Sequence, residues 1–79
     1  MKIIKTNSSK ITIDIIKQRL IDAIKYSGIK QKDLAMQIGV KETMISEYIH
    51  TKKMPSLETF AKICSVLDID ANFLLGIID

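Results

Sequence analysis

Hydrogen-bonding side chains line one side of the segment ETMISEYIH, residues 42–50, if it is read as a helix. The other side is apolar and contains Met44, Ile45, Tyr48 and Ile49. The polar side carries Glu42, Thr43, Ser46, Glu47 and His50. Hydroxyl groups donate and accept hydrogen bonds, and carboxylates accept them, so this row can pair with the polar edges of bases in a DNA groove.

A second short helix is predicted just before this segment, over residues 31–38. Leu34, Ala35 and Ile38 are spaced to face inward together. Gly39 follows, and it supplies the positive φ that a sharp turn requires. Two short helices joined in this way form a helix-turn-helix, whose second helix enters the major groove of DNA. The sequence therefore predicts binding to double-stranded DNA.

Further helices are predicted on either side of this pair. Isoleucine and leucine recur at spacings of three and four over residues 13–27, which Thr12 can cap. Ser56 can cap a helix over 57–67, with an apolar stripe of Leu57, Phe60, Ala61, Cys64 and Leu67. Asp70 can cap a short helix over 71–75, ended by Gly76. The prediction is an all-α fold of five helices over 13–79, preceded by a basic arm or short extended segment over 1–12.

Length and composition limit the classes of protein to consider. The chain has 79 residues, of which 47% are hydrophobic, so it can build one small core. The single cysteine, Cys64, cannot form an internal disulfide, which favours the cytoplasm over secretion. No apolar run approaches the roughly 18–20 residues of a membrane span, and no signal peptide is evident. Tyr26 and Tyr48 are both expected to be packed rings with surface hydroxyls.

Charge is distributed unevenly along the chain. Residues 1–56 contain 11 basic and 5 acidic side chains, whereas residues 57–79 contain 1 basic and 4 acidic ones. One end of the sequence therefore favours anionic partners and the other does not.

These features together resemble the lambda-repressor/Cro-like family of helix-turn-helix regulators over about residues 14–75. The resemblance rests on Gln31, Leu34–Ala35, Ile38–Val40, Ile45–Ser46, Pro55–Leu57 and Leu67. It implies a compact five-helix DNA-binding domain with base-reading residues at Glu42, Thr43, Ser46 and Glu47, positions where the family contacts bases or adjacent phosphates. It also implies phosphate contacts from Gln31 and from the loop residues Lys52 and Lys53. His50 is a further candidate for contact with the DNA backbone. The alternative is that its side chain is simply solvated.

Two helix starts depart from the family pattern. The family usually has serine or threonine before the second and third helices, where this chain has Lys30 and Lys41. A lysine cannot accept hydrogen bonds from the free N–H groups, so each lost cap costs about 0.5–2 kcal/mol. A DNA phosphate would offset that loss. We therefore predict that both lysines contact phosphate.

An internal ion pair of the family is also replaced. Members often carry an arginine late in the first helix and a glutamate late in the third, and the matching positions here are Ile24 and Ile49. Joint replacement of a buried pair by apolar groups is neutral or stabilising, whereas loss of one partner is costly. We therefore predict that Ile24 and Ile49 touch.

Two carboxylates on the reading side oppose DNA binding in general. Glu42 and Glu47 repel phosphate, but a glutamate can accept a hydrogen bond from the N4 amino group of cytosine. The alternative is that one of them is a helix N-terminal charge or an ion-pair partner.

An apolar C-terminus predicts self-association. Phe73, Leu74, Ile77 and Ile78 are assigned to a dimer interface, since family members commonly dimerise through this end. A homodimer would read a near-palindromic operator with half-sites about one helical turn, ~34 Å, apart.

Three functions fit this sequence. The leading one is a Cro-like, phage or mobile-element repressor with no attached sensing domain. The alternatives are the antitoxin of a toxin–antitoxin pair and a protein-interaction module that has lost DNA binding. No enzyme, cofactor, metal site or small-molecule ligand is expected, because the sequence has one histidine, one cysteine and no phosphate-binding loop.

Overall fold

The computed structural model describes residues 11–79, which contain five helices and no strand. The helices are α1 (Ile13–Tyr26), α2 (Gln31–Ile38), α3 (Glu42–His50), α4 (Leu57–Leu67) and α5 (Ala71–Leu74). Each lies within one residue of its predicted bounds. The expectation for the N-terminal arm falls on residues 1–10, outside the described part of the chain.

Side-chain caps start three of these helices, as predicted. Thr12, Ser56 and Asp70 accept hydrogen bonds from backbone N–H groups in the first turns of α1, α4 and α5. Gly39 ends α2 in the left-handed conformation, with φ of 76°. A side chain at Gly39 would meet no atom within 4 Å, so its backbone angle alone favours glycine there.

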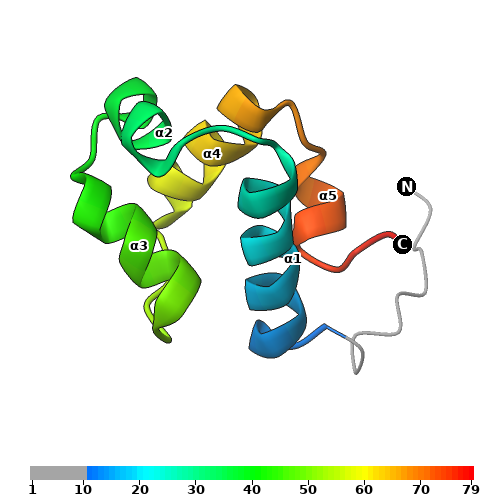
Figure 1. Ribbon diagram of the computed structural model, residues 1–79. Coiled ribbons are helices and arrows are strands. Elements are labelled where there is room, and N and C mark those ends of the chain that lie inside the picture. The colour runs from blue at the N-terminus through cyan, green and yellow to red at the C-terminus, as the bar shows by residue number, and fades with distance from the viewer. Residues whose placement is uncertain (1–10) are drawn as a thin grey trace.

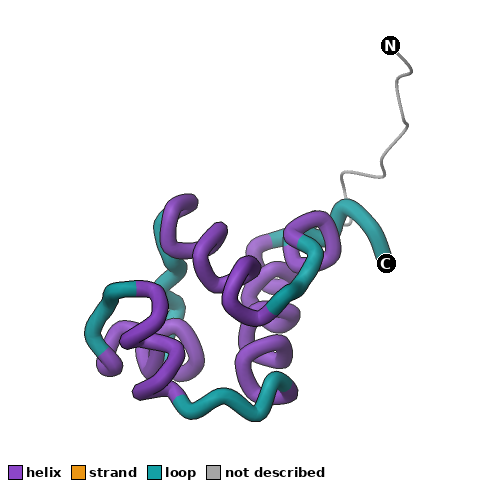
Figure 2. The backbone as a smooth tube through the Cα atoms, turned by 90° about the horizontal axis from the view of Figure 1, so that it is seen from above, coloured by secondary structure: helices purple, strands orange, loops and turns teal. Residues whose placement is uncertain are grey.

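The helices are arranged around α1, with α3 on one side of it and α5 on the other (Figure 1). α2 packs against both α3 and α4, while α5 packs against α1. The view from above shows the connecting loops running between these helices, with no strand in residues 11–79 (Figure 2). α3 therefore lies at an outer edge of the molecule.

A single apolar core joins all five helices. Its fully buried members include Leu20, Leu34, Ile45, Tyr48, Ile63 and Leu74. Such a core removes apolar surface from water, which stabilises the fold by about 25 cal/mol for each Å² buried. Its mainly aliphatic make-up agrees with the scarcity of aromatic residues in the sequence.

The apolar stripe predicted for α4 is right at Phe60, Cys64 and Leu67 but wrong at Leu57 and Ala61. Leu57 is 84% exposed and Ala61 is also exposed, whereas Phe60, Ile63 and Cys64 are buried. The i, i+3, i+4 pattern thus starts at Phe60, because Leu57 is the first residue of α4 and lies beyond the core.

The predicted contact between Ile24 and Ile49 remains a prediction. Ile24 is buried in the core, and Ile49 is partly buried and packs against the same cluster. We expect Ile49→Glu alone to lower the free energy of unfolding by about 1–3 kcal/mol, because it places an unpaired carboxylate beside apolar groups. Urea titration would measure this loss.

A double variant tests the contact itself. Adding Ile24→Arg to Ile49→Glu should recover part of the stability, since the two new charges can pair. If the double variant loses at least the sum of the two single losses, the two positions do not touch.

Candidate nucleic-acid interface

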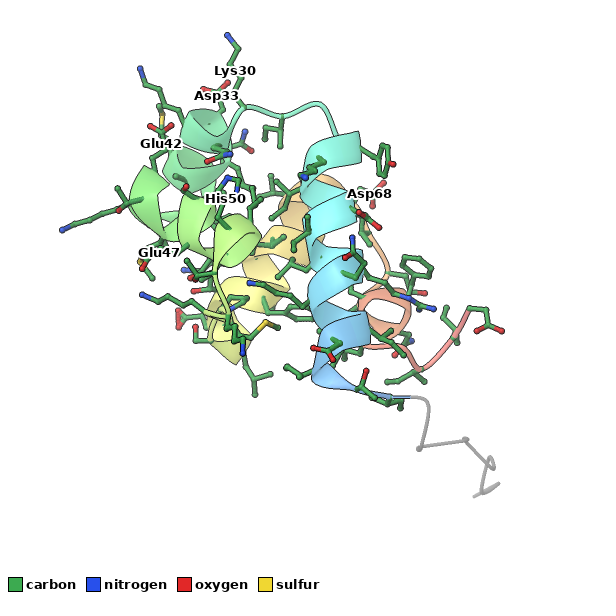
Figure 3. The ribbon with its side chains drawn as sticks, turned by 60° about the horizontal axis from the view of Figure 1, so that its bottom comes forward. Lys30, Asp33, Glu42, Glu47, His50 and Asp68 are labelled. Atoms are coloured by element: carbon green, nitrogen blue, oxygen red, sulfur yellow. The ribbon has the colours of Figure 1, made fainter. Side chains whose placement is uncertain are left out.

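The polar side of α3 faces solvent because its apolar side is anchored in the core. Ile45 and Tyr48 are almost completely buried, and they fix the rotation of the helix. The predicted reading residues therefore lie together on the outside: Glu42 and Thr43 are exposed, and Ser46 and Glu47 are half-buried. His50, the last residue of α3, is exposed. Figure 3 shows Glu42 and Glu47 on the side formed by α2 and α3, whereas Asp68 lies beyond α1.

Both helices of the turn start without a side-chain cap. Lys30 precedes α2 and Lys41 precedes α3, and neither makes a capping hydrogen bond. The backbone N–H groups at the start of each helix therefore have no side-chain acceptor among residues 11–79. The positive end of each helix dipole adds to the lysine charge. Both lysines are exposed, and Gln31 at the first position of α2 is half-buried. An anion such as phosphate is the natural partner of such a site.

The loop after α3 folds back onto the last turn of that helix. Thr51 donates its backbone N–H and its hydroxyl to the carbonyl of Glu47, at 2.9 and 2.7 Å. The same hydroxyl accepts from the backbone N–H of Lys53 at 3.1 Å. Lys53 then reaches Glu47, with Nζ 3.5 Å from Oε1. Of the two predicted loop lysines, Lys53 is therefore in an ion pair, and Lys52 is exposed.

Lys17 also belongs to this arrangement and is not among the residues predicted from the sequence. Its Nζ donates to the backbone carbonyl of Lys53 at 2.6 Å, linking α1 to the loop across 36 positions. Partial burial lowers the pKa of the Lys17 amino group below its usual range. No local pattern signals this contact, because it depends on how α1 packs beside the loop.

The predicted dimer surface needs one correction. Leu74 is fully buried in the core of its own chain, so it has no surface to offer a partner. Ile77 and Ile78 are 45% and 46% exposed, and Phe73 is half-buried. We refer to Phe73, Ile77 and Ile78 as the C-terminal surface.

Arg19 holds the C-terminal surface onto α1. Its Nη1 donates to the carbonyls of Phe73 and Ile78, at 2.5 and 2.8 Å. Its guanidinium also lies over the Phe73 ring, 4.3 Å from the ring centroid. The exposed isoleucines are thus presented on an ordered backbone.

Three further features concern metal binding, thiol chemistry and membrane insertion. Within residues 11–79, no three histidine, cysteine, aspartate or glutamate side chains are grouped to hold a metal ion. Cys64 is buried in α4, and burial raises the pKa of its thiol. None of the helices between residues 11 and 79 combines the length and apolar character needed to cross a membrane.

Comparison with known families supports the prediction that α2 and α3 form a helix-turn-helix. The model of the HTH_3 helix-turn-helix family, of Cro/CI type, matches residues 22–74, which include α2, α3, α4 and α5 in full. The match confirms the predicted resemblance and the all-α fold. No curated protein matches the chain.

Proposed function

Because the chain belongs to the Cro/CI-type helix-turn-helix family of DNA-binding regulators, we propose that it is a Cro-like, phage or mobile-element repressor. In this proposal, α3 lies in the major groove of a near-palindromic operator, and two copies bind as a homodimer in the cytoplasm. The observation that supports it best is the exposed polar side of α3, flanked by two uncapped helix starts that each carry a lysine.

The polar side chains on and around α3 are assigned roles suited to their chemistry. Glu42, Thr43, Ser46 and Glu47 lie on the side of α3 that would face the base edges, and we assign base contacts to them. The phosphate contacts are assigned to the starts of α2 and α3 and to the end of α3 with the loop after it: Lys30, Gln31, Lys41, His50, Lys52 and Lys53. Phosphate contacts position the protein, and base contacts select the sequence.

Selection of bound sequences from a random DNA pool tests this proposal. We expect enrichment of a near-palindrome with half-sites about one turn, ~34 Å, apart. Affinity for it should fall steeply as salt rises, because every phosphate contact releases counterions. No enrichment, with no DNA binding at low salt, would contradict the proposal.

That negative result would favour a protein-interaction module instead. Glu42 and Glu47 support this second candidate, because two carboxylates on the exposed side of α3 repel a phosphate backbone. The pool selection thus separates the two functions directly.

The dimer makes its own prediction. Replacing both Ile77 and Ile78 by lysine should convert a dimer into a monomer, because two added charges on each copy repel across a symmetric interface. Light scattering after size-exclusion chromatography would measure the mass. Leu57→Lys is the matched control, since Leu57 is an exposed apolar residue outside the C-terminal surface. A monomer before any substitution would exclude the proposed interface.

A further inference from the structure

One of the proposed base contacts, Glu47, is already occupied in the free protein. Two ion pairs occur within residues 11–79, namely Lys53–Glu47 and Lys62–Glu58, each with N and O 3.5 Å apart. The side chains of Lys53 and Glu47 are both about half exposed. Lys53 is itself a proposed phosphate contact, so Glu47 and a DNA phosphate compete for the same ammonium group.

The backbone around Lys53 is fixed from two directions. The Thr51 hydroxyl holds its N–H, and the Lys17 amino group holds its carbonyl. Its main chain is therefore tied to α3 on one side and to α1 on the other. Only the flexible side chain is left to change partners.

We propose that the Lys53 ammonium group moves from Glu47 to a DNA phosphate only where Glu47 meets the amino group of a cytosine. This rests on the proposed function and adds a selection step to it. A solvent-exposed ion pair is weak, so a phosphate can compete with Glu47 for the Lys53 ammonium group. The released carboxylate then needs a donor, and the N4 amino group of cytosine provides one.

At other bases the exchange is unfavourable. Thymine presents its O4 acceptor at the corresponding place in the groove, and a bare carboxylate would face it without a donor. Lys53 then stays with Glu47, and the complex lacks one phosphate contact. The base that faces Glu47 thereby controls how many phosphates the protein neutralises.

Salt dependence makes this difference measurable. Each phosphate contact to duplex DNA contributes about 0.9 to the slope of log affinity against log salt. With the selected operator, and with the same operator carrying thymine for cytosine in one half-site, the unchanged protein should give slopes that differ by about 0.9. The selected operator should have the steeper slope.

Two variants should remove that difference in distinct ways. In Lys53→Gln the slopes should coincide, and the thymine site should be discriminated against more strongly, since no lysine shields Glu47. In Glu47→Gln the slopes should also coincide, but discrimination should fall by roughly tenfold, as expected for a lost base contact. Glu58→Gln is the matched control, because it breaks an ion pair with the same 3.5 Å separation on α4. It should leave both slopes as they are.

The possible results separate this inference from the function beneath it. If the unchanged protein binds the operator specifically but gives equal slopes on both sites, the exchange is wrong and the repressor proposal stands. If no DNA is bound at all, both are wrong. A slope difference that persists in Lys53→Gln would also overturn the exchange, because another cation would then be responsible.

Discussion

Tyr48→Ala should lower the free energy of unfolding by about 3–5 kcal/mol, the range for deleting a large buried aromatic side chain. Tyr48 is 1% exposed and is among the largest fully buried side chains of the described chain. Small domains are stabilised by only about 5–15 kcal/mol, so this one change removes much of the total. Because Tyr48 also anchors α3, DNA binding should be lost with the fold.

The chain contains a matched control for this substitution. Tyr26 is the other tyrosine, and it is 86% exposed at the end of α1. Tyr26→Ala should change stability by no more than about 0.5 kcal/mol, as is usual for surface positions. Urea titration of both variants would compare the losses. Equal losses would show that the α3 anchor is not where the structure places it.

Replacing Lys30 and Lys41 together by serine should stabilise the free protein and weaken its complex with DNA. Each serine can cap a helix start that now lacks a cap, which contributes about 0.5–2 kcal/mol. In a domain of this size, each kcal/mol raises Tm by about 4–8 °C. The same change removes two proposed phosphate contacts per copy, and each should lower the salt slope by about 0.9.

A rise in stability together with a loss of DNA affinity distinguishes a binding role for the lysines from a merely poor helix start. Lys32→Ser removes the same charge inside α2, where serine cannot serve as the N-cap, so it should not raise Tm. Calorimetry measures Tm, and titration of the operator at several salt concentrations measures DNA affinity and its salt slope. If the double variant binds DNA as well as the original chain, the lysines do not exchange folding stability for phosphate binding.

Local rules were enough to predict the helices and their ends. The caps Thr12, Ser56 and Asp70 and the turn at Gly39 follow from the sequence, because each depends on the chemistry of a few neighbouring residues. Burial was harder to predict. Leu57 fits an apolar stripe in sequence yet is exposed, and Leu74 fits an apolar surface yet is fully buried. In both cases the outcome depends on which other helix lies beside the residue.

Some features of the candidate site likewise follow from local sequence, and others depend on tertiary packing. The sequence by itself determined the turn, the polar side of α3 and the lysines at two helix starts, since these follow from spacing and residue type. Only the tertiary structure decided that Tyr48 is buried while Tyr26 is exposed, and that Lys17 holds the loop that places Lys53 beside Glu47. The Lys17 contact joins residues 36 positions apart. Its formation depends on the packing of whole helices, which local periodicity does not contain.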